Sequence, residues 1–303
     1  MKNSVLAVDI GATKAAIALI DNGLKIIERI DVLTGDRTEI WDEISNEVIK
    51  LISRNHVLIG GIGIGSAGPI HEEIGAISPV NIPHWREFPI VSNFSELLKI
   101  DTGQVILHGD AIALAHAEHK VGAGKGLANM LGMVVSTGIG GGLILNGKLF
   151  TGATGNAGYF GHHTIAFESD QCVCGRTGCA EFYASGPQMV KYAKNLGWQG
   201  KTNSFEELAE DARNGSDIAV KSIQRGADAL AQAIVNVLCI LDLNAVVVGG
   251  GVIQAGDIYW NYLEERVQLH AEYAKFIGKV DLRKSTLNKD AGIIGAALAY
   301  LDR

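Results

Sequence analysis

The sequence predicts an α/β protein with two lobes, each built on a mixed β-sheet, and three observations lead to this prediction. Apolar runs of strand length alternate with helical patterns along the chain. A block of strand, glycine-rich turn, strand, Asn-Gly turn and strand occurs twice, which indicates two duplicated halves. Finally, 303 residues exceed one small core and suit two domains of ordinary size or one large domain, of which we expect the two.

The first block predicts three strands, over residues 4–10, 15–20 and 24–32, with Asp21-Asn22-Gly23 as a hairpin signal. A helix over 38–54 follows, and Thr38 is a suitable N-cap because its hydroxyl can accept a hydrogen bond from the first turn. The remaining pattern of this half predicts a strand over 56–64, a short helix over 91–100, a strand over 103–109 and a helix over 110–121.

The second block, residues 130–150, repeats the first, because "MLGMVVSTGIGGGLILNGKLF" aligns with "VLAVDIGATKAAIALIDNGLKI". We expect a small lobe of residues 1–113 plus 290–303 and a large lobe of residues 114–289. After the second block the pattern predicts helices over 186–196, 204–214 and 217–242, a strand over 245–250, a helix near 257–276, a strand near 278–286 and a closing helix over 290–302.

Composition excludes several classes of protein. With 47% hydrophobic and 19% charged residues the chain can bury a large core, and a net charge of −7 gives no electrostatic reason for nucleic-acid binding. No apolar stretch approaches the length of a membrane span, and the N-terminus resembles neither a signal peptide nor an anchor. We therefore expect a cytoplasmic protein without nucleic-acid or membrane partners.

Three glycine-rich turns follow strands and are candidate nucleotide-binding segments. In "DIGATK", Asp9 ends a strand, Gly11 lets the backbone approach a phosphate, and Thr13 and Lys14 offer donors, although an ordinary hairpin turn explains this segment equally well. Two further turns would hold the same polyphosphate and a flat adenine: "STGIGGG", with Thr137, Gly138 and Gly140, and "VVVGGGV", with Gly250 and Gly251.

Two common nucleotide motifs are excluded. The stretch "GIGSAG", residues 63–68, matches G-x-G-x-x-G, but Pro69 follows it at once and the next residues do not predict the required helix. The P-loop pattern G-x-x-x-x-G-K-[ST] does not occur in the sequence.

Three of the four cysteines lie within residues 172–179, downstream of the adjacent His162 and His163. A disulfide, a redox pair and a metal site are the alternatives. Cys172 and Cys174 are too near for easy pairing, and the redox pattern C-x-x-C is absent. The fourth cysteine, Cys239, lies in an apolar helix, where we expect a buried structural thiol.

Taken together, these segments resemble the ROK family of bacterial sugar kinases and repressors, on the actin-like ATPase (ribonuclease H-like) fold. The most specific similarity is "GNAGYFGHH" followed by "CVCGRTGCAE", and "NMLGMVVSTGIGGGLILNGKLFTG" is equally typical. The resemblance covers nearly the whole chain. It implies an ATP-dependent sugar kinase that uses Mg²⁺ with ATP and carries a structural Zn²⁺ in a zinc-binding loop.

The resemblance also implies roles for individual residues. Asp110 would be the general base that takes the proton from the sugar 6-hydroxyl, whereas spacing alone favours a role as the N-cap of its helix. His162 would bind zinc through one ring nitrogen and the sugar through the other, with His163 as its rival. The remaining implied sugar contacts are Gly68, Asn81 and Tyr159, and the remaining implied zinc ligands are Cys172, Cys174 and Cys179.

Two departures from the family pattern leave the sugar open between a hexose and an N-acylhexosamine. Gly109 precedes Asp110 where many family kinases have Asn, and Tyr159 stands where many have Glu. A second hypothesis is therefore a catalytically weak or inactive sugar sensor. We do not expect a DNA-binding repressor, because the first strand begins by about residue 4 and leaves no room for a helix-turn-helix.

We also expect a homodimer, with the helices at 217–242 and 258–276 as a possible face, although their apolar stripes suit core packing as well.

Overall fold

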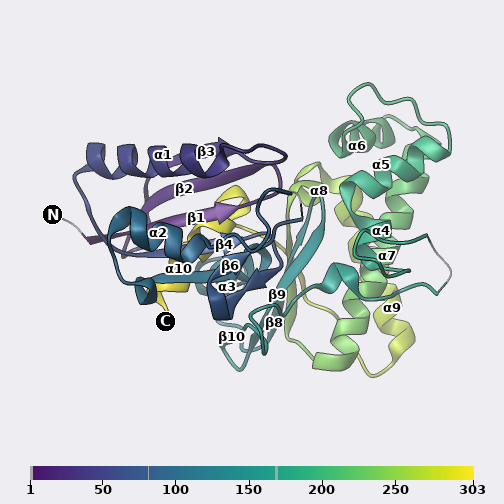
Figure 1. The fold of residues 1–303 in the computed structure, drawn as a ribbon. Coiled ribbons are helices and arrows are strands. Elements are labelled where there is room, and N and C mark those ends of the chain that lie inside the picture. The colour runs from purple at the N-terminus through teal and green to yellow at the C-terminus, as the bar shows by residue number, and fades with distance from the viewer. Residues whose placement is uncertain (1–2, 81, 168–169) are drawn as a thin grey trace. The chain divides into compact units, whose positions relative to one another are not determined.

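The computed structural model describes residues 3–80, 82–167 and 170–303, which form two compact units (Figure 1). Unit 1 contains residues 1–121, 149–158 and 289–303, and unit 2 contains residues 122–148 and 159–288. These limits differ from the lobes expected from the sequence. A whole helix, residues 110–121, stays in unit 1 because it packs against the C-terminal helix, and residues 149–158 also join unit 1.

Unit 1 is built on a five-stranded mixed sheet in the order β3-β2-β1-β4-β7. The central strand β1 pairs antiparallel with β2 and parallel with β4, and β4 pairs parallel with β7. The strands are β1 (Asn3–Ile10), β2 (Lys14–Asp21), β3 (Ile26–Leu33), β4 (Leu58–Ser66) and β7 (Val105–Gly109). A two-stranded hairpin of β5 (Ile70–His71) and β6 (Ala76–Ile77) encloses the 3-10 helix η1 (Glu72–Ile74).

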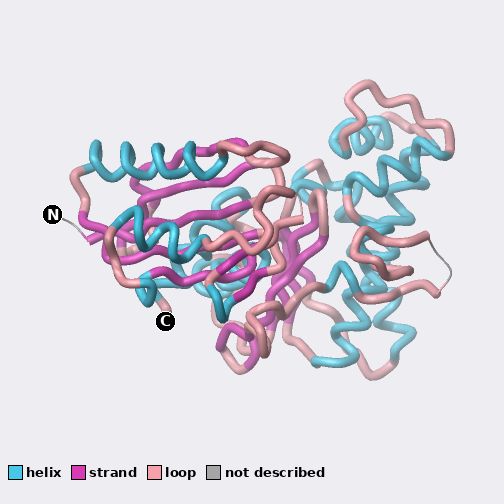
Figure 2. Tube along the Cα trace, in the orientation of Figure 1, coloured by secondary structure: helices cyan, strands magenta, loops and turns pink. Residues whose placement is uncertain are grey.

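Helices cover both faces of this sheet (Figure 2). On one face α1 (Ile40–Asn55) and α2 (Ile90–Leu98) share an apolar core with the strands, and on the other lie α3 (Asp110–Val121) and α10 (Ala291–Leu301). A short 3-10 helix, η2 (Thr102–Gln104), precedes β7. The expected Thr38 cap is wrong: Glu39 occupies the N-cap position of α1, and its side chain makes no capping hydrogen bond.

The alternation of residues along β4 explains how α10 lies so close to the sheet. Ile62 and Ile64 point into the apolar core with α1 and α2, so Gly63 between them points to the opposite face. A Cβ on Gly63 would lie 1.7 Å from the carbonyl oxygen of Ala296 in α10. The "GIGSAG" stretch therefore begins in a strand against which a helix packs. It is followed by β5 and the three-residue 3-10 helix η1, not by the α-helix that the dinucleotide motif requires.

Unit 2 repeats the topology of unit 1, which confirms the predicted duplication. Its sheet has the order β10-β9-β8-β11-β12, and β8 pairs antiparallel with β9 and parallel with β11, as β1 does with β2 and β4. The strands are β8 (Met130–Val135), β9 (Ile139–Leu145), β10 (Lys148–Phe150), β11 (Ala245–Gly249) and β12 (Leu282–Lys284), the last much shorter than the strand expected near 278–286.

The helices of unit 2 pack on this sheet around a second apolar core. The long helices α7 and α9 bury their apolar stripes in that core, where Leu230, Ile234 and Leu263 are fully covered. These stripes are therefore used within the chain and give no support to the expected dimer face, and the homodimer stays a prediction. The helices are α4 (Ala180–Ala184), α5 (Gly186–Asn195), α6 (Phe205–Arg213), α7 (Asp217–Leu241), α8 (Gly251–Gln254) and α9 (Asp257–Ala274), with 3-10 helices η3 (Phe160–His162) and η4 (Asn288–Asp290).

Two further observations concern exposure. The expectation that Cys239 is a buried thiol is wrong: the residue is exposed, because it lies on the outer side of α7 beside Ile240, which is 79% exposed. Over the described ranges, none of the helices combines the length and the apolar character needed to cross a bilayer.

The close packing of α10 predicts that Gly295→Ala destabilises the protein. Alanine in an exposed helix interior is favoured over glycine by about 1 kcal/mol, but here the new Cβ would lie 1.8 Å from the carbonyl oxygen of Ala113 in α3. Relief of such an overlap costs about 1–3 kcal/mol or more, so the overlap outweighs the helix preference. Thermal unfolding should show a lower Tm for Gly295→Ala.

The matched control is Gly278→Ala, because a Cβ on Gly278 meets no atom within 4 Å. Equal unfolding temperatures for the Gly295 and Gly278 variants would contradict the packing argument.

Candidate functional site

In unit 1, the predicted residues gather where the parallel strands β1, β4 and β7 end. Asp9 lies opposite Gly65 in the pairing of β1 with β4, and Ser66 lies opposite Gly109 in the pairing of β4 with β7. Asp110 follows directly as the first residue of α3. Because parallel strands end at the same edge of a sheet, both aspartates lie beside Gly65: a Cβ there would be 3.7 Å from Asp9 Oδ1 and 3.7 Å from the Asp110 Cα.

The surroundings of these two carboxylates disfavour their ionised forms. Burial, together with the charge of Asp110, raises the pKa of Asp9 to about 7, against the opposing charges of Arg29 and Lys14. Burial also raises the pKa of Asp110, although its carboxylate accepts a 2.7 Å hydrogen bond from the Ala111 N–H. This bond to the next residue shows that Asp110 also contacts the first turn of α3, so a local role in the helix and a chemical role are compatible.

The "DIGATK" turn joins β1 to β2 as a tight turn. The Gly11 N–H donates to the Lys14 carbonyl at 2.9 Å, and the Thr34 hydroxyl donates to the Gly11 carbonyl at 3.0 Å. Thr13 is exposed at the tip. Among the described residues, the N–H groups of Ala12 and Thr13 have no hydrogen-bond acceptor, so they are available to an anion.

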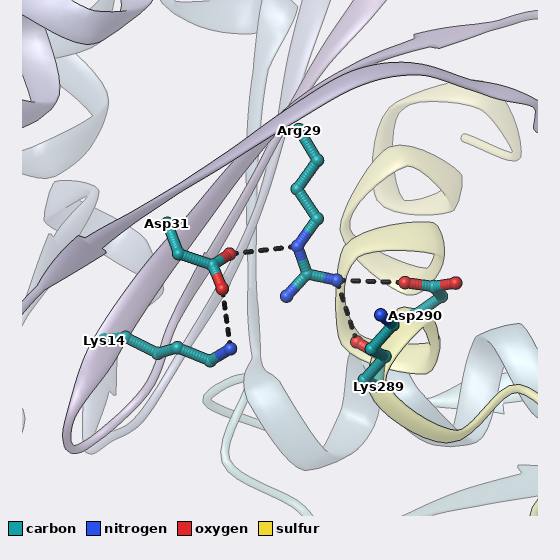
Figure 3. A network of polar contacts seen from close by, with 5 residues as sticks. All are labelled: Lys14, Arg29, Asp31, Lys289 and Asp290. Atoms are coloured by element: carbon teal, nitrogen blue, oxygen red, sulfur yellow. Dashed lines mark hydrogen bonds and ion pairs between the residues drawn. The ribbon is translucent and has the colours of Figure 1, made fainter.

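The Lys14 side chain is held by a network of charges within unit 1 (Figure 3). Its Nζ lies 2.7 Å from Asp31, and Asp31 also accepts a 2.9 Å hydrogen bond from Arg29 Nε. Arg29 Nη1 in turn bonds Asp290 at 2.9 Å and the Lys289 carbonyl at 3.1 Å, immediately before α10. The network therefore connects the turn at residues 11–14 with the start of the helix that covers Asp9.

The predicted sugar loop also starts at this sheet edge. The Ala67 N–H donates to the Ile10 carbonyl at 2.7 Å, which places Gly68 just beyond the end of β1. The Gly68-Pro69 peptide bond is cis. Asn81 lies outside the described residues. The carbonyls of Pro79 and Ile82 accept hydrogen bonds from Arg86 Nη1 at 2.6 and 3.2 Å.

In unit 2, the second and third glycine turns meet at Ser136. The Ser136 N–H donates to the Gly138 carbonyl at 2.9 Å, and its carbonyl accepts from the Gly186 N–H at 2.9 Å at the start of α5. A Cβ on Gly251 would lie 3.3 Å from Ser136 Oγ. Gly250 has φ +101°, and a Cβ there would lie 2.4 Å from the Val135 carbonyl oxygen, so only glycine fits.

The turn itself is exposed and carries free donors. Thr137 is exposed at its tip, and Gly140 lies in β9 opposite Val134. Within the described part of the chain, the N–H groups of Thr137 and Gly138 have no hydrogen-bond acceptor. This turn is therefore equivalent to the one at residues 11–14 in the duplicated topology.

The structure brings His162, Cys172, Cys174 and Cys179 together, and their ligand atoms all lie within 4.8 Å of one another. His162 Nδ1 lies 3.7 Å from Cys172 Sγ, and Cys174 Sγ lies 3.6 Å from Cys179 Sγ. Two thiolates bound at about 2.3 Å to one tetrahedral ion are about 3.8 Å apart, so the set fits zinc. Four protein ligands would leave no open position on such an ion, as in structural zinc sites.

Glycines close the loop around this cluster. Gly175 and Gly178, on either side of Arg176 and Thr177, have φ +88° and +73°, the left-handed region that the reversal requires. A Cβ on Gly178 would lie 1.7 Å from the Ala166 carbonyl oxygen. His163 is not part of the cluster: its Nδ1 bonds the Phe160 carbonyl, so the structure favours His162 as the ligand.

Glu181 is a candidate functional residue that the sequence interpretation missed. Its Oε2 accepts a 2.7 Å hydrogen bond from the Ile139 N–H of the glycine turn, and its Oε1 lies 3.9 Å from His162 Nε2. Because His162 Nδ1 faces the cysteines, Nε2 and Glu181 lie on the side of the ring away from Cys172. The Tyr159 ring, 45% exposed, lies 6.2 Å from the His162 ring at an interplanar angle of 25°. The final glutamate of "CVCGRTGCAE" was the signal for Glu181.

Comparison with known proteins finds relatives that match along the whole chain. A family model described as the ROK family matches residues 5–303. A glucokinase of Thermotoga maritima is 30% identical, and the alignment covers 100% of this chain and 98% of that protein. An N-acetylmannosamine kinase of Escherichia coli O7:K1 is 35% identical, with 98% of each chain covered.

Solved structures show the same fold. The ROK hexokinase from Thermus thermophilus superposes with a TM-score of 0.86 at 30% identity, covering 99% of this chain and 98% of that one. A ROK family glucokinase from Streptomyces griseus, solved in complex with glucose and AMPPNP, gives a TM-score of 0.82 at 27% identity, with 97% and 98% covered. The predicted actin-like ATPase fold is thereby confirmed.

The raised pKa of Asp9 predicts a pH-dependent effect of Asp9→Asn on stability. The folded protein keeps its proton up to about pH 7, whereas the unfolded chain loses it near the ordinary value of 3.8, so ionisation reduces stability as the pH rises between these values. Asn cannot ionise. The stability advantage of Asp9→Asn over the wild type should therefore grow from pH 5 to pH 8, by at most about 2–3 kcal/mol.

Urea unfolding of the ligand-free protein at the two pH values measures this difference. Asp42→Asn, which removes an exposed carboxylate at the start of α1, is the control. An advantage of equal size at pH 5 and pH 8 would show that Asp9 is not perturbed.

The metal cluster predicts that Cys174→Ser lowers the zinc content of the purified protein by about tenfold or more, because a neutral hydroxyl replaces a thiolate ligand. Elemental analysis by mass spectrometry measures the content. Cys239→Ser should retain zinc, since the exposed Cys239 is not part of the cluster. Equal zinc in both variants would exclude Cys174 as a ligand.

Proposed function

The chain belongs to the ROK family, and we propose that this sugar kinase transfers a phosphoryl group from ATP to the 6-hydroxyl of a hexose or N-acylhexosamine, with Asp110 as the general base. Its relatives are named glucokinase and N-acetylmannosamine kinase, and the similarity extends over the whole length of the chain. The similar glucokinase from Streptomyces griseus was solved with glucose and AMPPNP.

The observation that carries the proposal is the position of Asp110 at the start of α3, beside Asp9 and at the end of β7. A general base must be deprotonated before it acts and must bind the proton during transfer. Burial raises the pKa of Asp110, which makes its carboxylate a better proton acceptor than an exposed aspartate. Phosphoryl transfer needs mainly a positioned hydroxyl, a base and charge stabilisation, so one such carboxylate suffices.

The two glycine turns supply the donors for the nucleotide in this proposal. The N–H groups of Thr13 in unit 1 and Gly138 in unit 2 would bind phosphate oxygens, and Lys14 would exchange Asp31 for a phosphate. Gly250 and Gly251 offer bare backbone against which an adenine can lie. When bound with ATP, Mg²⁺ neutralises charge on the transferred group. We place Asp9 near that cation. No described residue donates a hydrogen bond to its carboxylate, and a nearby cation would favour the ionised form of that carboxylate.

On the sugar side, we assign Gly68, Asn81, Tyr159 and His162 to the acceptor, and we add Glu181. His162 Nε2 and the Glu181 carboxylate offer a donor and an acceptor side by side, which suits a pair of sugar hydroxyls. The structural zinc would hold the ring of His162 through Nδ1 and so fix the direction of Nε2.

Gly109 bears on the choice of sugar. A Cβ on Gly109 would meet only Ile112 side-chain atoms, at 3.6 and 3.8 Å, and its φ is not in the left-handed region. The fold therefore does not require glycine here, and the missing side-chain amide beside Asp110 is a chemical difference from many family kinases. The proposed acceptor is therefore still a hexose or an N-acylhexosamine.

A homodimer and a cytoplasmic location stay predictions.

The alternative is a catalytically weak or inactive ROK protein that senses a sugar. The departures at Gly109 and Tyr159 favour it, because Tyr159 is assigned to the acceptor and Gly109 directly precedes Asp110. A coupled assay of ADP release over glucose, mannose, N-acetylglucosamine and N-acetylmannosamine separates the two functions. Turnover with any of these sugars supports the kinase, and sugar binding without turnover supports the sensor.

Asp110→Asn should lower kcat by about 10²- to 10⁴-fold, because the amide keeps the shape of the side chain but cannot accept the proton. The variant should keep its fold and bind the sugar with an affinity within a few fold of the wild type. Steady-state kinetics and calorimetric sugar binding measure both quantities. Asp101→Asn, at the exposed cap of η2, is the control. If Asp110→Asn retains wild-type turnover, Asp110 is not the base.

A further inference from the structure

Residues 149–158 form a strap that is grouped with unit 1, although its first two residues end β10 of the second sheet and the chain belongs to unit 2 on either side. The strap closes on itself, since the Ala157 N–H donates to the Thr151 carbonyl at 2.9 Å. Gly152, with φ +81°, permits this closure, because a Cβ there would lie 3.1 Å from the Ala157 Cβ. The segment is thus an ordered loop with its own internal bond.

The Asn156 side chain attaches the strap to β5. Its Oδ1 accepts from the Ile70 N–H at 3.1 Å, and its Nδ2 donates to the Ile70 carbonyl at 2.9 Å. One amide thereby satisfies both backbone groups of a residue 86 positions away, as a neighbouring strand would. Ile70 itself is buried, so leaving these groups without partners would be costly.

Close backbone contact reinforces this attachment. Gly155 is buried with φ +75°, and a Cβ there would lie 2.6 Å from Glu72 Oε2 and 3.2 Å from Ile70 Cδ1. A larger residue would push the strap away from β5 and η1. The strap and the hairpin are therefore complementary in shape as well as in hydrogen bonding.

Ile70 and the strap are each adjacent in sequence to residues assigned to the acceptor. Ile70 follows Gly68 and Pro69, and the Pro69 carbonyl accepts from the Ser78 N–H at 2.9 Å, at the start of the loop that contains Asn81. On the other side, the strap ends at Gly158, and the chain enters unit 2 at Tyr159. Only Ala157 and Gly158 separate Asn156 from Tyr159.

We propose that Asn156 is a positioning residue for the acceptor sugar: its amide fixes the Gly68–Ile70 segment to the strap from which the Tyr159–His162 segment departs. The inference rests on the proposed function, because it takes Gly68, Tyr159 and His162 as acceptor contacts. Asn156 touches neither reacting atom. It acts by setting where two sugar-binding segments begin, so it should influence the affinity for the sugar and not that for the nucleotide.

Two substitutions test the role of the amide. Asn156→Ala removes both hydrogen bonds to Ile70 and the Nδ2 bond to the Thr154 carbonyl. Asn156→Asp keeps an acceptor for the Ile70 N–H while placing a carboxylate oxygen against the Ile70 carbonyl. Asn55→Ala is the matched control, because Asn55 Nδ2 donates to the Leu51 carbonyl at 2.8 Å within the same unit. It borders no assigned acceptor contact.

Kinetics and calorimetry give the first readout, with glucose and N-acetylmannosamine as probes. Asn156→Ala should raise the KM and the Kd for the sugar by about tenfold, and Asn156→Asp by more, whereas the KM for Mg-ATP should change by less than about twofold. A merely structural role would lower the unfolding temperature without this split between the two substrates. Equal changes in both KM values, or none in either, would overturn the proposal.

Hydrogen exchange of the ligand-free protein gives the second readout, which needs no activity. Asn156→Ala should speed exchange in residues 68–72 and in residues 157–163, whereas Asn55→Ala should leave both segments unchanged. Unchanged exchange in residues 157–163 would overturn the inference. A wild type that binds and phosphorylates neither sugar would refute the proposed function, and the exchange result would then still decide whether Asn156 holds the two segments together.

Discussion

The close approach of α10 to the sheet and to α3 is the constraint on which unit 1 depends. Glycines make it possible: Gly63 of β4 lies under the Ala296 carbonyl, Gly295 lies against the Ala113 carbonyl, and a Cβ on Gly292 would lie 2.1 Å from Asp9 Oδ2. With no side chain between them, the helix rests directly on backbone. The helix that completes the core of this face therefore also covers the carboxylate at the end of β1.

This packing has an electrostatic consequence for the site. Burial beneath α10, together with a second carboxylate on α3, raises the pKa of Asp9, and burial raises that of Asp110. Two half-buried, poorly solvated acids reduce stability at neutral pH, while Arg29 partly compensates from β3, where it also anchors Asp290 at the start of α10. A basic carboxylate beside phosphate-binding turns is what transfer to a hydroxyl requires, so the instability serves the proposed chemistry.

The sequence predicted the architecture well, because strand period, helix period and glycine turns are local signals and the second block repeats the first. It failed where solvent exposure or a distant partner decides. Cys239 has apolar neighbours in sequence but lies on the outer side of α7, and Thr38 resembles a cap but is followed by Glu39 at the cap position. His162 could be separated from His163 only by family spacing, and Asn156 acts on a residue 86 positions away, which no local pattern reveals.

The central claim is that one carboxylate, held at the start of α3 by this packing, accepts the proton of the acceptor hydroxyl. A crystal structure with a bound sugar and a non-hydrolysable ATP analogue tests it most directly. The account predicts the Asp110 carboxylate within about 3 Å of the hydroxyl that faces the terminal phosphate, and the turns at Gly11 and Gly138 against the phosphates. A complex in which another side chain contacts that hydroxyl, with Asp110 beyond hydrogen-bond distance, would contradict it.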